Sequence, residues 1–327
     1  MERYLIISVS STIFSGGGEN EAGWKFLRHQ TEERVKMLLP KFQYHEPSTI
    51  DEVCQIMAEF KERACPLAGG TDLLVKMKNK IISPDNVVSL GRIEKLTDVD
   101  HSGDRLTIGA CRTVAQIAQS GRIRDGFNAL KIGAGSLGSP LIRNLATIGG
   151  NILTARPAAD LPPPLMAYGA RVILRKSSGE RSVSLDDFFR GPGLTLLFPD
   201  EILTEIVMEK PPPNSGAGYI KLGLRKAQEI SLVNVAVFVS LDGQGNTIKT
   251  ARVVLGAVAP VPMRATSAEH VLIGEKPGES LFIKAAETAA GESKPIDDFR
   301  GSAQYRRDMV KVLTLRALNM AYKEART

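Results

Sequence analysis

Two glycine pairs have the residue types and spacing best suited to chemistry, namely the binding of an anion. Gly69–Gly70 is followed by Thr71, and Gly149–Gly150 is preceded two residues earlier by Thr147. Consecutive glycines can adopt positive φ and turn successive N–H groups into one concavity, where no β-carbon obstructs a phosphate oxygen. The threonine hydroxyls add donors beside those amides. A glycine pair alone is more often a plain turn, but together these two predict a diphosphate site.

A third glycine-rich segment, Gly133–Gly138, matches the dinucleotide pattern G-x-G-x-x-G, with Asp160 about 20 residues further on. The nicotinamide fingerprint needs an unbroken helix after the glycines and a strand that ends at the acid. Gly149–Gly150 interrupts such a helix, and Pro157 falls inside the supposed strand. We therefore expect crowded helix packing or a loop here, and no Rossmann site.

Other reactive side chains form no recognisable site. The three cysteines, Cys54, Cys65 and Cys111, lack C-x-x-C spacing. An iron–sulfur cluster needs more thiolates than these, so any cluster belongs to a partner. The four histidines are scattered. Asp186–Asp187 precedes two phenylalanines and is expected to be structural. The sequence predicts no catalytic side chain and no metal ligand.

Composition and charge narrow the class of protein. The formal net charge is +6, and 42 basic residues are dispersed among 36 acidic ones. Such a pattern predicts no nucleic-acid partner, whereas it suits an anionic small ligand. The apolar stretch 4–14 is interrupted by serine and threonine and is shorter than the ~20 residues of a membrane span. We expect a cytoplasmic protein without a membrane span.

The elements that must position the first glycine pair form a small α/β unit. Ser48–Asp51 has a capping-box pattern, and apolar residues then recur at helical spacing, which predicts a helix over about 49–61. A short strand over 64–68 runs into the glycines, and Thr71 is expected to cap the next helix. A further strand over 87–90 completes the unit.

The middle of the chain is predicted to hold strands and short helices. A strand is expected over 106–110, and Thr113 begins a second capping-box pattern. Repeated glycine and proline exclude long regular helices between about 149 and 193. The segments 171–175 and 181–183 flank a turn and predict a hairpin.

A proline-rich linker, Pro211–Gly216, is the clearest domain boundary. Beyond it two β-prone segments, 231–241 and 248–258, flank a polar glycine-rich loop and predict another hairpin. Helices are expected over 279–291 and 305–324. The C-terminal part is therefore predicted to be a separate α+β domain.

The segments Ala68–Asp72 and Thr147–Asn151 resemble the flavoprotein subunits of the molybdenum hydroxylases. These include the medium subunit of aerobic carbon monoxide dehydrogenase, the FAD domain of xanthine dehydrogenase and the β subunit of 4-hydroxybenzoyl-CoA reductase. The likeness runs over about 40–321, with Ile142–Asn144 before the second motif and Ala159–Leu161 after it. A cysteine-rich loop that some benzoyl-CoA reductase relatives insert is missing.

The resemblance implies an α+β fold class: a two-subdomain FAD-binding fold of the vanillyl-alcohol-oxidase or PCMH type, then a C-terminal α+β domain of sheet and helices. The expected FAD-binding domain is 37–211, with subdomains of about 37–95 and 96–211. The expected carbon-monoxide-dehydrogenase-flavoprotein-like domain is 217–323. Residues 1–36 fit neither domain, and we expect them to be a dispensable extension or the result of an upstream start codon. Their removal should leave a soluble flavoprotein.

The resemblance also implies which residues hold FAD. In the family both glycine loops hold the FAD pyrophosphate, an acid contacts the cofactor, an apolar side chain meets the flavin and a lysine lies near the ring. The last three match Asp160, Leu203 and Lys221, and Leu137 stands where some relatives have an aromatic residue. The complete implied set is Leu67, Ala68, Gly69, Gly70, Thr71, Asp72, Leu73, Leu74, Leu137, Thr147, Ile148, Gly149, Gly150, Asn151, Asp160, Leu203 and Lys221.

By the same resemblance this chain is an oxidoreductase subunit that relays electrons through FAD. A large partner subunit would hold the molybdopterin cofactor, and a small partner subunit would hold [2Fe–2S] clusters. The external electron acceptor would be NAD, quinone or oxygen. One alternative is a self-contained FAD-dependent reductase of the UDP-N-acetylenolpyruvoylglucosamine reductase type, which would reduce its own substrate with NADPH. Another is a nucleotide-binding scaffold subunit without redox turnover.

Overall fold

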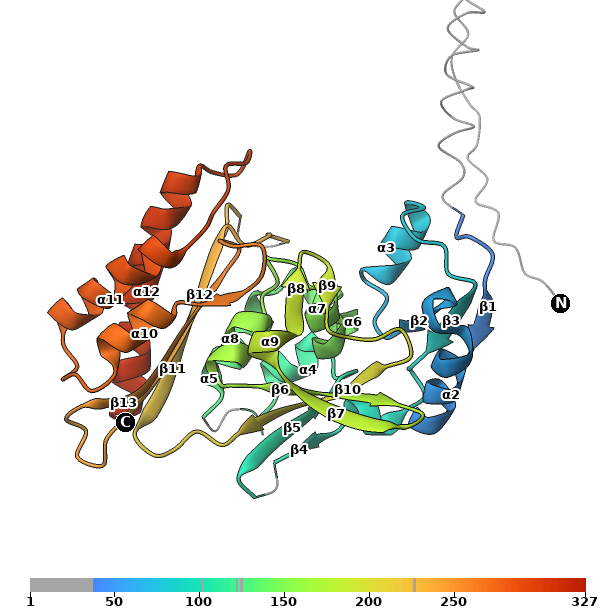
Figure 1. Cartoon of the computed structure of the whole chain (residues 1–327), viewed down its shortest axis with the longest axis horizontal. Coiled ribbons are helices and arrows are strands. Elements are labelled where there is room, and N and C mark those ends of the chain that lie inside the picture. The colour runs from blue at the N-terminus through green and yellow to red at the C-terminus, as the bar shows by residue number, and fades with distance from the viewer. Residues whose placement is uncertain (1–37, 102, 122, 124–125, 226–227) are drawn as a thin grey trace, which may run out of the picture. The chain divides into compact units, whose positions relative to one another are not determined.

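A computed structural model gives the arrangement of the chain (Figure 1). Every helix and strand named below lies within a compact unit that spans 40–327. The expected extension over 1–36 lies outside the described residues. The described residues are 38–101, 103–121, 123, 126–225 and 228–327.

A three-stranded parallel sheet in the order β1–β3–β2 opens this unit. It confirms the predicted α/β arrangement around the first glycine pair, because these glycines lie in the turn that connects β2 to α3. Buried side chains of α2 pack with this sheet in one apolar cluster. The elements are β1 (Gln43–His45), α2 (Ile50–Phe60), η1 (Lys61–Arg63), β2 (Ala64–Leu67), α3 (Leu73–Lys78), β3 (Asn86–Ser89) and η2 (Glu94–Thr97).

The capping box of α2 lies one residue later than the sequence pattern placed it. Thr49 Oγ1 accepts from the N–H of Glu52 at 3.2 Å, and the Glu52 carboxylate accepts from the N–H of Thr49 at 3.3 Å. Ser48 donates its own N–H to that carboxylate at 2.7 Å and does not cap the helix. Thr49 takes this role because its backbone is extended, with φ −129°, immediately before the helix.

A five-stranded antiparallel sheet follows, in the order β4–β5–β10–β6–β7. The predicted strand near 106–110 and the predicted hairpin are confirmed as β5 and as β6–β7. Of these five strands, β10 comes last in the sequence, yet it lies between β5 and β6 in the sheet. The chain that connects these strands therefore leaves the sheet and returns to it. The strands are β4 (Val99–Asp100), β5 (Arg105–Gly109), β6 (Arg171–Lys176), β7 (Gly179–Ser184) and β10 (Ile202–Glu209).

The chain between β5 and β10 forms short helices, as the glycine and proline content predicted. In α8 three prolines occupy the first turn, where backbone N–H groups have no helical acceptor. Thr113 caps α4 through a capping box with Gln116, which confirms that prediction. The elements are α4 (Val114–Gln119), α5 (Asn128–Ser136), α6 (Pro140–Leu145), α7 (Ile148–Leu153), α8 (Pro162–Ala167), α9 (Leu185–Phe188), β8 (Phe189–Gly191) and β9 (Leu194–Thr195).

These helices and the five-stranded sheet share one apolar core. Leu106, Ile108 and Ile206 contribute from the strands, and Ile117 and Leu130 contribute from α4 and α5, all fully buried. Each such side chain stabilises the fold by roughly 1.5–3 kcal/mol relative to leaving it exposed. Residues on both sides of the second glycine pair are also buried in this core, which fixes the position of the pair.

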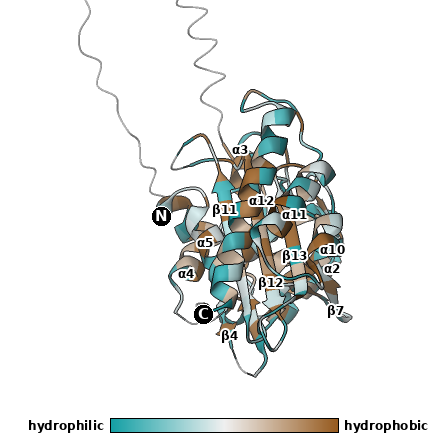
Figure 2. Cartoon of the chain, turned by 90° about the vertical axis from the view of Figure 1, so that its left-hand side faces the viewer, coloured by the Kyte–Doolittle hydropathy of each residue, from teal (hydrophilic) through white to brown (hydrophobic). Residues whose placement is uncertain are grey.

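The C-terminal part is a four-stranded antiparallel sheet in the order β11–β12–β13–β14 with three helices. Figure 2 shows α11 and α12 in front of β12 and β13. Apolar residues of all three helices are buried in one cluster with those strands. The predicted hairpin and both predicted helices are confirmed. The elements are β11 (Ser215–Leu222), β12 (Val233–Leu241), β13 (Ile248–Gly256), β14 (Met263–Arg264), α10 (Thr266–Leu272), α11 (Glu279–Glu292) and α12 (Ala303–Ala325).

The predicted linker ends earlier than expected, because its last two residues belong to β11. A β-carbon at Gly216 would lie 2.2 Å from the carbonyl oxygen of Ala321. Gly216 is therefore needed for the close approach of α12 to β11, and the prediction that this residue belongs to the linker is wrong.

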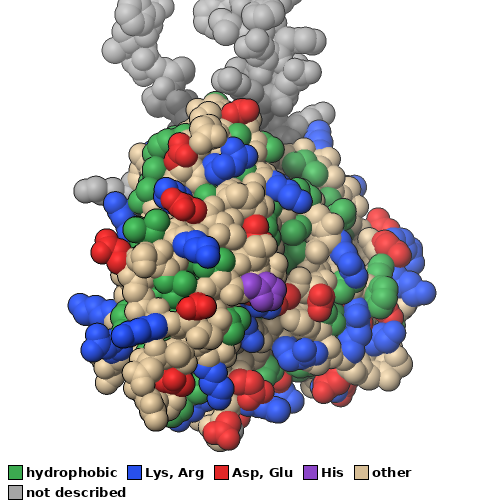
Figure 3. Space-filling model, turned by 60° about the vertical axis from the view of Figure 1, so that its left-hand side comes forward, with side chains coloured by type: hydrophobic (Ala, Val, Ile, Leu, Met, Phe, Trp, Pro, Cys, Tyr) green, Lys and Arg blue, Asp and Glu red, His purple; other side chains and the backbone are tan. Residues whose placement is uncertain are grey.

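Two surface properties complete the description. Figure 3 shows Lys and Arg side chains interspersed with Asp and Glu on one face of the described chain. Among the helices described, none combines the length and the apolar character needed to cross a bilayer.

Candidate cofactor-binding site

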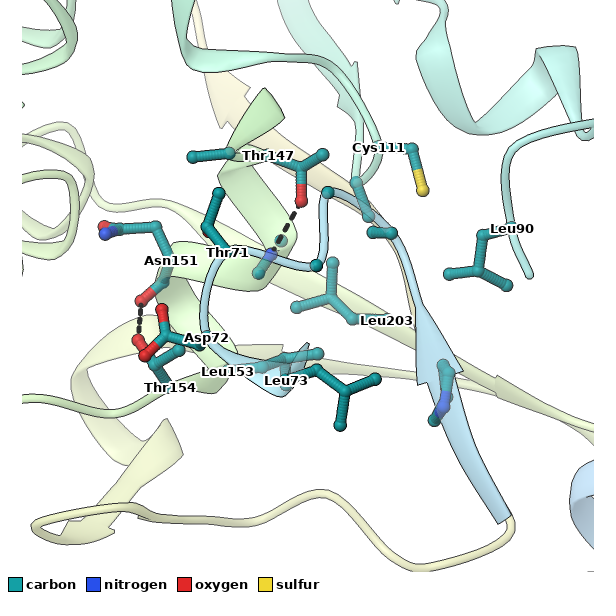
Figure 4. Close-up of a pocket in the computed structure, with 18 of the residues that line it drawn as sticks. Thr71, Asp72, Leu73, Leu90, Cys111, Thr147, Asn151, Leu153, Thr154 and Leu203 are labelled. Atoms are coloured by element: carbon teal, nitrogen blue, oxygen red, sulfur yellow. Dashed lines mark hydrogen bonds between the residues drawn. The ribbon is translucent and has the colours of Figure 1, made fainter. Parts of the chain in front are cut away.

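A cavity of about 410 Å³ brings the two glycine turns together (Figure 4). Its size falls within the ~300–1,000 Å³ typical of small-molecule sites. It is lined by the turn after β2, by the segment after β5, and by α7 with its preceding turn. Most of the residues implied by the resemblance line it: Ala68, Gly69, Gly70, Thr71, Asp72, Leu73, Leu137, Thr147, Gly149, Gly150, Asn151 and Leu203.

The first glycine turn presents unpaired backbone donors to this cavity. Gly70 has φ +70°, in the left-handed region that favours glycine. Leu74 is the first residue after the turn whose N–H is bonded, to Gly70 O at 3.1 Å. Within the described chain, the N–H groups of residues 69–73 have no hydrogen-bond partner. Since backbone donors need an acceptor, this turn suits an anionic ligand.

Thr71 does not cap α3, contrary to the sequence prediction. The residue at the N-cap position is Asp72, and its side chain makes no capping bond. Thr71 and Asp72 instead form the turn between Gly70 and the helix, so both side chains lie along the cavity (Figure 4). The Thr71 hydroxyl therefore remains available to a ligand.

The second glycine pair is built differently, and the prediction of unpaired amides is wrong there. The N–H of Gly149 donates to Ala110 O at 2.9 Å, and the N–H of Gly150 donates to Thr147 Oγ1 at 3.1 Å (Figure 4). Neither glycine has positive φ, because both lie in the first turn of α7. Both amides therefore already have hydrogen-bond acceptors within the chain, whereas the hydroxyl hydrogen of Thr147 can still be donated to a ligand.

The glycines of the second pair provide space. A β-carbon at Gly149 would lie 2.8 Å from both the oxygen and the β-carbon of Ala110, so this glycine permits α7 to pack on the end of β5. A β-carbon at Gly150 would meet only Thr147 Oγ1, at 2.9 Å. The missing side chain of Gly150 therefore keeps the cavity open.

Gly69 joins the two turns. A β-carbon at this residue would lie 1.8 Å from the carbonyl oxygen of Leu145, the last residue of α6. The second turn begins two residues later, at Thr147. Gly69 thus allows the first turn to lie directly against the backbone that leads into the second.

Several cavity residues were not identified from the sequence. Lys76 is the clearest omission, because it follows Asp72 by one helical turn and is the basic residue among those lining the cavity. No ion pair of Lys76 occurs in the part of the chain that the structure describes. The apolar residues gave no signal, because the cavity depends on the packing of distant segments. The omitted residues are Cys65, Pro66, Lys76, Ile82, Leu90, Ala110, Cys111, Ile142, Ala146, Leu153 and Thr154.

Two of these residues are free thiols in different surroundings. Burial raises the pKa of Cys111 to about 12. Burial also raises the pKa of Cys65, but the nearby Lys76 ammonium opposes that effect. Cys54 is buried in the core beside α2. All three cysteines are free.

Asp160 and Lys221 form a buried ion pair and do not line the cavity. Lys221 Nζ lies 2.9 Å from Asp160 Oδ2, and the two side chains are 9% and 8% exposed. Lys221 also donates to the carbonyl oxygens of Ser136 and Glu229, at 3.1 and 2.9 Å. Its three ammonium hydrogens therefore each have an acceptor within the chain.

The Asp160 carboxylate accepts further bonds, from Ser231 at 2.8 Å and Tyr219 at 3.3 Å. Burial raises the pKa of Asp160, and the Lys221 ammonium opposes that shift. The pair is adjacent to the cavity wall, since Ser136 precedes Leu137 and the residue after Asp160 donates its N–H to Asn151 Oδ1. Leu67, Leu74 and Ile148 also lie outside the lining residues.

The remaining motifs are structural, as expected. In the segment Gly133–Gly138 a β-carbon at Gly133 would lie 3.1 Å from Pro164, which confirms crowded helix packing. Asp186 pairs with Arg264 at 3.0 Å between α9 and β14. No cluster of potential metal ligands occurs among the residues described.

Comparisons with known proteins agree with this geometry. Residues 40–210 match the family described as the FAD binding domain in molybdopterin dehydrogenase. Residues 219–321 match the CO dehydrogenase flavoprotein C-terminal domain. Both parts of the predicted fold are therefore matched, in the predicted order.

Individual relatives match over nearly their whole length. The glyceraldehyde dehydrogenase medium chain of Sulfolobus acidocaldarius is 33% identical, over 86% of this chain and 98% of that protein. The carbon monoxide dehydrogenase medium chain of Hydrogenophaga pseudoflava is 31% identical, over 88% and 99%. A solved carbon monoxide dehydrogenase from Hydrogenophaga pseudoflava has a TM-score of 0.83 and 30% identity, covering 88% of this chain and 99% of that chain.

Proposed function

Since this chain belongs to the FAD-binding medium subunits of the molybdenum hydroxylase family, and is thereby an oxidoreductase subunit, we propose that it holds FAD between its two glycine turns and relays electrons. The electrons would pass between [2Fe–2S] clusters of a small partner subunit and an external acceptor such as NAD, quinone or oxygen. A large partner would hold the molybdopterin cofactor and the substrate.

One observation carries the proposal: the unpaired N–H groups of residues 69–73 border a cavity that the second turn also lines. A dinucleotide diphosphate has two negative charges, and clustered backbone amides bind such oxygens without the entropy cost of ordering a side chain. The Lys76 ammonium adds positive charge at the same cavity. Gly150 leaves space where any side chain would intrude on the ligand.

The chain's own residues bind, orient and shield the cofactor. When bound, FAD supplies the electron-transfer chemistry, so no general acid or base is required from the protein. We propose that Leu203, Leu153 and Leu137 cover apolar parts of the ligand and exclude water. We propose that Asp160 and Lys221 act from outside the cavity, because their pairing fixes the segments that carry Leu137 and Asn151.

The proposed domains follow the same division. We propose an FAD-binding domain over 37–211, with subdomains of about 37–95 and 96–211, and a C-terminal domain over 217–323. The matched segments 40–210 and 219–321 support these boundaries.

The proposal is tested on the full chain purified alone and then with its co-purifying subunits. We expect one FAD per chain, with absorption bands near ~370 and ~450 nm, and molybdenum and iron in the assembly but not in the isolated chain. Substrate added to the assembly should bleach the flavin bands. A colourless chain that still binds its partners would favour the scaffold alternative, and NADPH-dependent turnover of an enolpyruvyl sugar by the chain alone would favour the self-contained reductase.

A further inference from the structure

A second cavity, of about 490 Å³, lies in the C-terminal part of the chain, near the end that Figure 1 marks C. Its walls are the loop between β12 and β13, the connection between α10 and α11, the end of α12 and the residue before β11. Among the described residues, none lines both this cavity and the proposed FAD cavity. The polar side chains that line it belong to Asn214, Gln244, Asn246, Lys276, Tyr322 and Arg326.

The charge of this cavity is positive. Its lining includes the cations Lys276 and Arg326 and, within the described chain, no acidic side chain. Neither cation forms an ion pair with a described side-chain or terminal carboxylate. Two unpaired cations facing one cavity attract an anion, and they suit a ligand group with two negative charges.

The acids nearest in the sequence do not neutralise these cations. Both carboxylate oxygens of Asp242 accept hydrogen bonds within their own loop, at 2.8 and 2.9 Å. The Glu324 carboxylate accepts the N–H of Ala217 at 2.7 Å and is therefore directed toward β11. Glu275 is exposed and does not line the cavity. The positive charge thus remains available to a ligand.

Backbone hydrogen bonds fix the walls of the cavity. The N–H of Leu241 donates to Asn214 O at 2.8 Å, which ties the residue before β11 to the end of β12. The N–H of Ile248 donates to Glu275 O at 3.0 Å, which ties the connection after α10 to the start of β13. A ligand therefore meets walls that are already ordered, and this lowers the entropy cost of binding.

The neutral side chains indicate what the rest of the ligand is. The Arg326 guanidinium lies 5.7 Å from the centre of the Tyr322 ring, and the edge of that ring packs with Phe282, so the ring is not free to stack on a base. Asn246 donates an amide N–H to Gln244 Oε1 at 3.1 Å. The amide hydrogens of Gln244 and the amide oxygen of Asn246 remain available, and such groups match hydroxyl groups, which donate and accept.

We propose that this cavity binds a phosphate ester of a small hydroxylated molecule, such as a sugar phosphate. The Lys276 ammonium and the Arg326 guanidinium bind the phosphate oxygens, and the amide side chains bind the hydroxyl groups. The cavity volume falls within the ~300–1,000 Å³ typical of small-molecule sites. This site is separate from the FAD cavity and does not depend on the proposed function.

The test is calorimetric titration of the full chain in excess FAD, so that the first cavity is occupied. Glucose 6-phosphate should bind once per chain, and glucose should not bind. The double variant Lys276→Gln with Arg326→Gln should bind glucose 6-phosphate at least about tenfold more weakly. The control Lys284→Gln with Arg316→Gln makes the same charge change at exposed residues outside the cavity and should bind as the wild type does.

Four results would overturn the proposal: no binding of glucose 6-phosphate, wild-type affinity in the double variant, equal weakening in the control, or equal affinity for inorganic phosphate. A second measurement needs no substitution. Lys276 and Lys284 are both exposed, so both should react with acetic anhydride. Glucose 6-phosphate should slow the acetylation of Lys276 alone, as mass spectrometry of the labelled peptides can show. An unchanged rate at Lys276 would place the ligand elsewhere.

Discussion

The two glycine turns share a sequence pattern but differ in backbone arrangement. In the first turn the N–H groups of residues 69–73 have no partner within the described chain, and Gly70 has φ +70°. In the second turn the N–H groups of Gly149 and Gly150 are bonded to Ala110 O and Thr147 Oγ1. The first turn can therefore bind an anion through its backbone, and the second forms a wall.

The comparison shows that four similar glycines are required for four physical reasons. Gly70 allows a left-handed backbone, and Gly69 allows contact with the carbonyl group of Leu145. Gly149 allows α7 to approach β5, and Gly150 leaves the cavity open. A glycine pair in a sequence does not distinguish these cases, but substitutions at the four positions do.

The largest effect is expected from Gly69→Ala, which tests whether the turns touch. The β-carbon would lie 1.8 Å from Leu145 O, and a backbone oxygen cannot rotate away. We expect the free energy of unfolding to fall by more than the ~1–3 kcal/mol typical of overpacking, as measured by urea denaturation. The control is Gly135→Ala in α5. A β-carbon at this position would have no neighbouring atom within 4 Å, so the free energy of unfolding should rise by about 0.5–1 kcal/mol. Equal stability of the two variants would contradict the contact.

The variant Gly150→Val tests whether the second turn borders the space that the ligand occupies. The new β-carbon would meet only the hydroxyl oxygen of Thr147, at 2.9 Å, and the side chain would extend from there into the cavity, so the protein should fold. Intrusion costing ~1–3 kcal/mol or more should weaken FAD binding by ~10-fold to over 100-fold and give a colourless protein. Flavin fluorescence titration measures the affinity. Stoichiometric yellow flavin in this variant would exclude Gly150 from the binding surface.

A pair of threonine variants separates capping from ligand binding. Thr147→Val removes the acceptor of the Gly150 N–H, so the free energy of unfolding should fall by ~0.5–2 kcal/mol. Thr71→Val removes no capping bond, and its stability should remain within about 0.5 kcal/mol of the wild type. Thermal unfolding of both apoproteins is the measurement. A larger loss of stability in Thr71→Val than in Thr147→Val would contradict the assignment of the capping hydroxyl to Thr147.

The smallest effect concerns thiol reactivity without loss of stability. Because burial raises the pKa of Cys111 to about 12, this thiol should stay protonated and resist iodoacetamide at pH 8, then gain reactivity as the pH rises toward that value. Cys65 is only half-buried and should react faster in the apoprotein. Bound FAD should protect Cys65, as mass spectrometry of labelled peptides can show. Unchanged labelling of Cys65 with FAD would place the ligand elsewhere.

Local patterns were sufficient for much of the fold. The helix α2 and the hairpin β12–β13 appear within a few residues of their predicted bounds, because their signals are periodicity, capping and turn residues close together in the chain. Gly216 was misassigned because its close neighbour, Ala321, is distant in the sequence. Contacts of this type depend on tertiary packing, which neighbouring residues do not encode.

The candidate site shows the same limit. The residues of both turns were identified, yet the bond from Gly149 to Ala110 joins segments separated by a whole group of helices. The unpaired amides of the first turn and the paired amides of the second therefore had the same sequence signal. Lys76 was recognisable in principle from its helical spacing after Asp72.

A crystal structure of the FAD-loaded chain tests the central claim most directly. It should show diphosphate oxygens within ~2.7–3.2 Å of at least two backbone nitrogens between Gly69 and Leu73. The bonds from Gly149 to Ala110 and from Gly150 to Thr147 should persist. A diphosphate out of reach of the first turn, or bonded to the Gly149 and Gly150 amides after those bonds have broken, would contradict the account.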